Sequence, residues 1–77
     1  YNRANAHMAT ADYRSAIADY THAIAIDQRL AEAYFNRGLA YIHLGQRQEG
    51  ISDLSKAGEL GLYRAYSVIK QEKDVKR

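Results

Sequence analysis

The side chains in this sequence that could do chemistry are its histidines, serines and carboxylates. His7, His22 and His43 do not stand at metal-binding helical spacing, and the sequence has no cysteine to complete a zinc site. A nucleophilic serine needs a histidine and an aspartate arranged to activate it, and every serine lies inside an expected helix without that arrangement. A glycine-rich phosphate loop would follow a strand, and no segment alternates as a strand does. The sequence therefore predicts a protein that is not an enzyme and that holds no metal and no cofactor.

Two aspartates, Asp19 and Asp53, stand at matching places in two expected helices. Charged side chains on the outer side of a helix are usually solvated or weakly paired. We expect both carboxylates on the outer surface, in water or paired with lysine, rather than in a catalytic site.

Composition sets the limits for the elements that position these side chains. A chain of 77 residues forms one domain at most, and it buries only about 60% of the surface that its unfolded form exposes. The hydrophobic share of 47% and the charged share of 26% are ordinary for a soluble globular chain. A net charge of +2 is too small and too dispersed to predict binding to nucleic acid. No apolar run is long enough for a membrane span.

Internal repetition is the most informative feature of the sequence. When the chain is shifted against itself by 34 residues, small, aromatic and aliphatic positions coincide over most of the overlap. The clearest identities are Asn2-Arg3 on Asn36-Arg37, Ala6 on Ala40, Ile17 on Ile51, Asp19 on Asp53, and Ala23 on Ala57. Small residues at Ala16 and Gly50 predict places where two helices nearly touch.

Each copy of the repeat is expected to form two amphipathic helices. Apolar residues recur at helical spacing, Gly45 stands at a helix end, Asp12 is a candidate N-cap, and proline is absent. The five expected helices, stacked antiparallel, span about 1–10, 13–27, 31–44, 47–60 and 63–75. In the last helix Tyr63, Tyr66 and Ile69 form a narrow apolar stripe, which suits a terminal helix with one buried face.

The second copy carries aromatic, small, aliphatic and basic residues at regular positions along its two helices. They are Tyr34, Arg37, Gly38 and Tyr41, then Gly50, Leu54, Ala57 and Leu62. This pattern resembles the tetratricopeptide repeat (TPR) family of bacterial type, and the segment 56–61 is similar to Sel1-like repeats. The resemblance covers about residues 1–62 and implies an all-α helix-turn-helix solenoid of about two and a half repeats. A single domain, 1–77, would then comprise a first repeat (1–30), a second repeat (31–62) and a capping helix (63–77). The sequence opens on Tyr1 without an initiating methionine, so we expect it to be a piece of a longer protein, of unknown localisation.

The resemblance also implies a function, because the first helices of such units usually line a concave groove that holds a peptide or a partner protein. The residues that map to this groove are Tyr1, Asn2, Asn5, Met8, Glu32, Phe35, Asn36, Leu39, Ile42 and His43. Phe35, Leu39 and Ile42 form a second apolar stripe on the third helix, beside its core stripe. A helix that is apolar on two sides needs two apolar surroundings. Either neighbouring helices cover this second stripe, or part of it is exposed to a partner.

Three further hypotheses remain open on this sequence. Some related domains bind the terminal carboxylate of a peptide through a clamp of basic residues and asparagines, and Asn5, Asn36 and Lys70 could fill three of its positions. Tyr1, however, stands at a position where that clamp has lysine. The leading function is a protein-binding scaffold module, and the alternative is a structural element that stacks on further copies of itself. Apolar surface near the expected groove also predicts that the isolated fragment forms a homodimer at high concentration.

Overall fold

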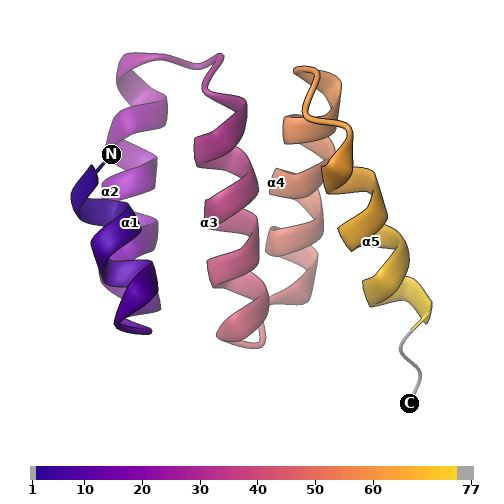
Figure 1. Cartoon of the computed structure of the whole chain (residues 1–77), viewed down its shortest axis with the longest axis horizontal. Helices are drawn as coiled ribbons and strands as arrows, with labels where there is room; N and C mark the ends of the chain where they lie inside the picture. Colours follow the sequence, from indigo (N-terminus) through magenta and orange to yellow (C-terminus); the bar gives the residue numbers. More distant parts are fainter. Residues whose placement is uncertain (1, 75–77) are drawn as a thin grey trace.

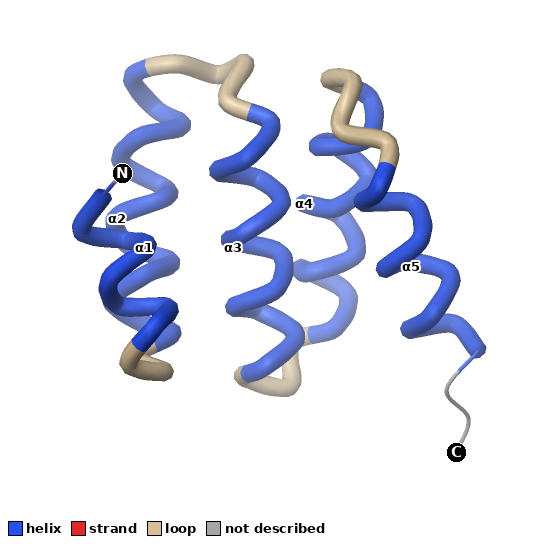
Figure 2. Tube along the Cα trace, viewed as in Figure 1, coloured by secondary structure: helices blue, strands red, loops and turns tan. Residues whose placement is uncertain are grey.

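The computed structural model describes residues 2–74, and the side chains of residues 4–72. Its helices are α1 (Asn2–Ala9), α2 (Tyr13–Ile26), α3 (Ala31–His43), α4 (Arg47–Glu59) and α5 (Arg64–Asp74). Each boundary lies within one residue of the expected one, and no strand occurs between residues 2 and 74 (Figure 2). The prediction of an all-α fold with five helices is confirmed.

The helices form a stack in which each one runs antiparallel to the next (Figure 1). Extensive packing occurs between α1 and α2, α2 and α3, α3 and α4, and α4 and α5. The helices α1, α3 and α5 lie on the near side in Figure 1, with α4 and much of α2 behind them. This arrangement is the helix-turn-helix repeat array that the period of the sequence predicts.

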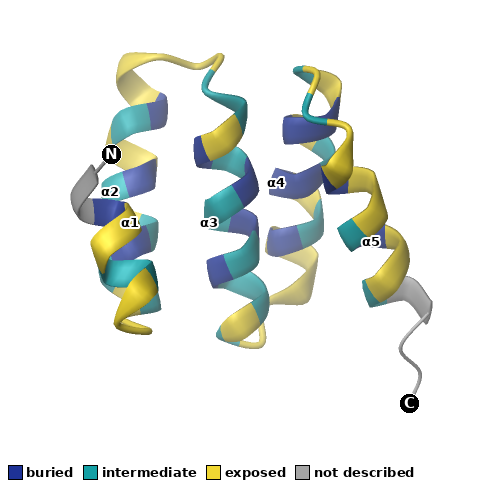
Figure 3. Cartoon of the chain, viewed as in Figure 1, coloured by how far each residue is buried: buried dark blue, intermediate teal, exposed yellow. Residues whose placement is uncertain are grey.

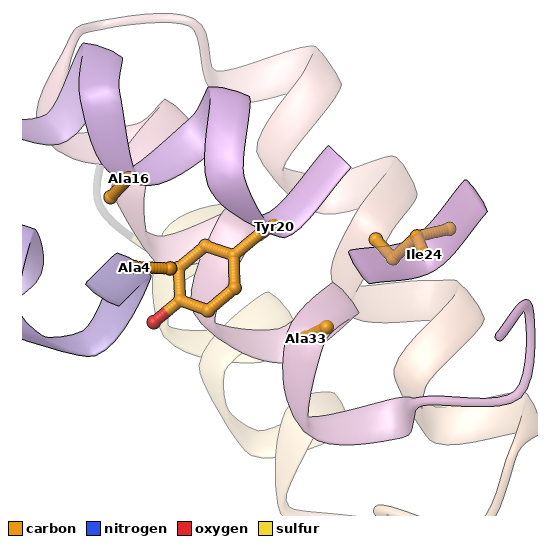
Figure 4. Packing of buried hydrophobic residues seen from close by; sticks show 5 residues of the cluster. All are labelled: Ala4, Ala16, Tyr20, Ile24 and Ala33. Atoms are coloured by element: carbon orange, nitrogen blue, oxygen red, sulfur yellow. The ribbon is translucent and has the colours of Figure 1, made fainter. Parts of the chain in front are cut away.

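The buried hydrophobic residues form two clusters, and Figure 3 shows the buried residues of the helices in dark blue. The first cluster comprises Ala4, Ala16, Tyr20, Ile24 and Ala33, and Figure 4 shows the Tyr20 ring beside Ala4. The second comprises Phe35, Leu54, Ala57, Ala65 and Ile69. The partly buried Tyr34 packs against both clusters, so the core is continuous from one repeat to the next.

The turn that connects α1 to α2 is held by hydrogen bonds of Asp12. The Asp12 side chain accepts a hydrogen bond from the backbone N–H of Ser15 at 3.4 Å, which confirms Asp12 as the N-cap of α2. At the end of α1 the backbone N–H of Asp12 donates to the carbonyl of His7 at 2.8 Å. This bond closes the turn and requires Ala11 to take a left-handed conformation, with φ of 63°.

The contact between α3 and α4 is close because glycines face each other across it. A Cβ atom added to Gly50 would lie 2.7 Å from the backbone oxygen of Gly38 and 2.6 Å from the Cγ1 atom of Ile42. A Cβ atom on Gly38 would lie 2.8 Å from the backbone oxygen of Gly50. The prediction that helices nearly touch at Gly50 is therefore confirmed. In the first repeat the matching residues, Ala4 and Ala16, are fully buried.

The expected apolar stripe of the last helix is wrong in two of its three members. Ile69 is buried, but Tyr63 is 73% exposed and Tyr66 is 46% exposed. The side of α5 that meets the stack is built instead on Ala65 and Ile69, one turn apart. The small side chain of Ala65 lets α5 approach the stack. The Tyr66 ring rests at the edge of this contact, over Gly58 of α4.

Candidate functional site

One side of α3 is only partly covered by the neighbouring helices. Its residues recur at helical spacing and are Glu32, Asn36, Leu39 and His43. Glu32 and His43 are exposed, and Asn36 and Leu39 are partly buried. Gly38, which meets Gly50 of α4, stands two residues after Asn36, on nearly the opposite side of the helix. We call the surface formed by this side of α3 and the adjoining sides of α1 and α5 the odd-helix face.

On α1 the odd-helix face carries Asn5, which is exposed. Its side-chain oxygen accepts a hydrogen bond from the hydroxyl of Tyr20, whose ring is fully buried between α1 and α2. This bond orients the carboxamide and directs its NH₂ group away from Tyr20. Asn5 is equivalent to Leu39 in the 34-residue period, and both are members of the surface that the sequence predicted.

On α5 the odd-helix face begins at Arg64. The Nη2 atom of Arg64 donates to both carboxylate oxygens of Glu32, at 3.2 and 3.3 Å. The Arg64 guanidinium also lies over the Phe35 ring, with its Cζ atom 4.8 Å from the ring centroid. Helical spacing places Ser67 and Gln71, both exposed, on the same side of α5 as Arg64.

The second apolar stripe of α3 is largely covered from within the chain. Phe35 is only 9% exposed and belongs to the second core cluster together with Ala65 and Ile69 of α5. Leu39 and Ile42 are partly buried and pack against the same cluster. Neighbouring helices cover Phe35 and partly cover Leu39 and Ile42. Phe35 therefore does not belong to the accessible surface, because the last helix takes the place that a partner would need.

Other members of the predicted groove are placed as follows. Met8 is partly buried against the first core cluster. His43 stacks on Tyr13, with ring centroids 4.6 Å apart and planes inclined by 4°, at the lower edge of the face. Tyr1 lies outside the described residues, and so does the side chain of Asn2.

The three candidate residues of a carboxylate clamp do not share one face. Asn5 and Asn36 both belong to the odd-helix face. Lys70 is exposed but follows Tyr66 by one turn, so it lies on the side of α5 where the Tyr66 ring meets Gly58. Two asparagines without that lysine are too few for the clamp.

The two repeated aspartates do not lie on the outer surface, and lysine is not the partner of Asp53. Asp53 is 7% exposed and receives two hydrogen bonds from Arg37. The Asp19 carboxylate is also largely covered and lies 3.6 Å from the Nε2 atom of His7. Our expectation failed because it weighed each aspartate alone. The recurrence of arginine together with aspartate at the same period, Arg37 with Asp53 and Arg3 with Asp19 in the sequence, was the available signal.

Comparison with protein families matches residues 4–45 to a model described as TPR repeat. A second model, described as tetratricopeptide repeat, matches residues 31–60. The chain belongs to the tetratricopeptide repeat family. Comparison with curated proteins gives no match. The bacterial type and the Sel1-like segment remain predictions.

Membership fits the chemistry of the described side chains. TPR repeats generally mediate protein–protein interaction, and TPR proteins are typically non-enzymatic scaffolds. His7 lies 3.5 Å from the Asp12 carboxylate, which resembles half of a catalytic triad. A triad would also need a hydroxyl that donates to the His7 ring. The neighbouring hydroxyl of Thr10 donates instead to the backbone carbonyl of His7.

Among the described side chains, those of residues 4–72, no three histidine or carboxylate groups lie together as metal ligands would. None of the helices described between residues 2 and 74 is long and apolar enough to cross a membrane.

Proposed function

We propose that this TPR chain is a protein-binding scaffold module, and that a peptide or partner protein binds to the odd-helix face. The observation that supports the proposal is the partly covered side of α3. Asn36 and Leu39 stand at its centre and are only partly buried, although the rest of that helix is packed on both sides. A helix in the middle of a stack offers such a surface only where the other helices do not cover it completely.

The flanking helices support the same surface. Asn5 on α1 and Ser67 on α5 are exposed beside the central stripe. The Tyr20 hydroxyl holds Asn5 in one orientation, so this part of the face is ordered before a partner arrives. Preorganised side chains bind with a smaller loss of conformational entropy.

Site-specific photocrosslinking tests this proposal. A benzophenone amino acid at Asn36 should crosslink a protein in an extract of the source cells, and excess unlabelled chain should compete the product away. The same amino acid at Ser52, which is exposed on α4, is the matched control. If Ser52 gives the same products, or Asn36 gives none that the unlabelled chain competes away, the odd-helix face is not the binding surface.

The alternative, self-association, is supported by exposed apolar side chains elsewhere. Ile26 is 83% exposed at the end of α2, and Tyr63 and Tyr66 project near the start of α5. The surface that we first expected to drive a homodimer is mostly covered, since Phe35, Leu39 and Ile42 pack against the second core cluster. A second copy would therefore dock at the start of α5.

A further inference from the structure

The turn between α1 and α2 is strained, and its counterpart in the second repeat is not. It comprises only residues 10–12, since α1 ends at Ala9 and α2 begins at Tyr13. Ala11 has a φ of 63°, a left-handed conformation that costs free energy for a residue with a Cβ atom. Gly45, one period later, has a φ of 84° without that cost, because glycine lacks the atom that clashes. A short, strained hinge of this kind favours the exchange of an element between two copies of a chain.

The segment around the turn is well suited to one continuous helix. Residues 2–26 include no glycine and no proline, and alanine, the strongest helix former, stands at the strained position itself. If Ala11 became right-handed, α1 and α2 would join, and the first backbone N–H groups of α2 would donate to the last carbonyls of α1. The joined helix would lose the N-cap bond between Asp12 and Ser15, which at 3.4 Å is long. Straightening therefore relieves strain and adds helical hydrogen bonds at the loss of one weak cap.

A single straightened copy would nevertheless be unstable, because α1 would leave its place on α2. In the hairpin, Ala4 is fully buried and lies beside the Tyr20 ring (Figure 4). The Tyr20 hydroxyl donates to the Asn5 side chain, and the Nε2 atom of His7 lies 3.6 Å from the Asp19 carboxylate. Straightening would remove all of these contacts and expose the apolar surface on both helices.

Two straightened copies can restore the lost contacts for each other. In the hairpin α1 runs antiparallel to α2 (Figure 1), so two joined helices that lie antiparallel place each α1 on the α2 of the other copy. The same contacts then form twice, related by a two-fold axis. The joined helices meet at the former turns, where Ala9, Thr10 and Ala11 are exposed and small enough for a close approach. The contacts of monomer and dimer are alike, whereas the strain at Ala11 is relieved in both copies.

We infer that this chain forms a domain-swapped dimer in which two copies exchange α1, and in which α1 and α2 of each copy become one helix. The exchange differs from docking at the start of α5, because it uses contacts that already exist within one copy. It also bears on the odd-helix face. Each such face in the dimer takes its Asn5 from the other copy, so one particle carries two faces that are each completed by the partner.

Glycine substitutions test the exchange by sedimentation equilibrium. The starting chain carries Tyr63→Ser, which removes the docking surface at the start of α5, and it should still dimerise at millimolar concentration. Ala11→Gly in this chain should raise the dimer Kd at least about a hundredfold, because glycine relieves the turn and weakens the joined helix in each copy. The matched control is Ala25→Gly, at an exposed position of α2. It should change the Kd less than about threefold, since residue 25 is helical in both forms.

Nuclear magnetic resonance identifies the exchanged contact directly. In an equal mixture of ¹³C-labelled and unlabelled Tyr63→Ser chains, isotope-filtered spectra should show the Ala4 methyl group of one copy close to the Tyr20 ring of another. Three results would overturn the inference: a chain that stays monomeric at millimolar concentration, an effect of Ala11→Gly no larger than that of Ala25→Gly, or an Ala4–Tyr20 contact found only within one copy.

Discussion

Arg37 of α3 and Asp53 of α4 form a two-point ion pair, with the Nε atom 2.7 Å from one carboxylate oxygen and the Nη2 atom 2.8 Å from the other. The remaining Nη1 atom donates to the Thr21 hydroxyl of α2 at 3.0 Å. One guanidinium thus joins three helices and links the two repeats. Parallel double contacts of this kind are among the stronger charged hydrogen bonds in proteins.

The pair should be a main polar contribution to stability. We expect Asp53→Asn to lower the free energy of unfolding by about 2–4 kcal/mol, because a mostly buried guanidinium loses its counter-charge. Glu49→Gln, an exposed site on the same helix, is the control and should change little. Urea unfolding followed by circular dichroism measures both, and equal effects would show that the pair contributes no more than a surface charge.

The same pair predicts how stability responds to pH. Hydrogen bonding to Asp53 raises the pKa of the Arg37 guanidinium, against the opposing effect of burial. A raised folded-state pKa gives a contribution that is complete below the unfolded pKa and is lost as pH rises through the folded one. For arginine that window is strongly alkaline. The stability difference between the native chain and Arg37→Gln should therefore be constant across neutral pH, which melts at several pH values can check.

Two glycines of α4 should respond differently to the same substitution. Gly50→Ala should destabilise by about 1–3 kcal/mol, although alanine favours a helix, because its Cβ atom would meet the backbone of Gly38. At Gly58 the three atoms nearest to the added one all belong to the Tyr66 ring, which is half-exposed and can turn away. Gly58→Ala should therefore be nearly neutral. Thermal melts compare them, and an unchanged or raised midpoint for Gly50→Ala would contradict the close approach.

The turns after α1 and α3 offer a reciprocal test. Ala11 and Gly45 are one period apart and both have left-handed backbones, with φ of 63° and 84°. Alanine costs about 1–2 kcal/mol in that conformation, partly offset by the greater unfolded-state entropy of glycine. Ala11→Gly should raise stability by about 0.5–1 kcal/mol, and Gly45→Ala should lower it by a similar amount. Changes of the same sign in both variants would refute this account.

Self-association should depend on Tyr63 rather than on Phe35. Light scattering over a dilution series should show the native chain associating at high concentration, and Tyr63→Ser should weaken this without changing the melting temperature. Phe35→Ser should instead destabilise the monomer by about 3–5 kcal/mol, because that ring is part of the core. A native chain that stays monomeric throughout the series would remove the support for this surface.

The sequence by itself determined the repeat, the ranges of the helices and part of their local chemistry. Its 34-residue period predicted the helices to within one residue, the N-cap at Asp12 and the close contact at Gly50. These features depend on the helix that carries the residue and on a spacing between residues. Because that spacing recurs in both copies of the repeat, one sequence shows it twice. The central part of the candidate face, Asn36 and Leu39, followed from the same spacing.

Only the tertiary structure decided which side chains meet across helices. The partner of Asp53, the cover over Phe35 and the buried side of α5 all depend on how neighbouring helices are rotated and how far their side chains reach. Helical periodicity gives the direction of a side chain on its own helix. It does not give the residue of the neighbouring helix that this side chain contacts. Arg64 could be placed over Phe35 only once α5 was docked beside α3, because helix packing and not local sequence brings those two residues together.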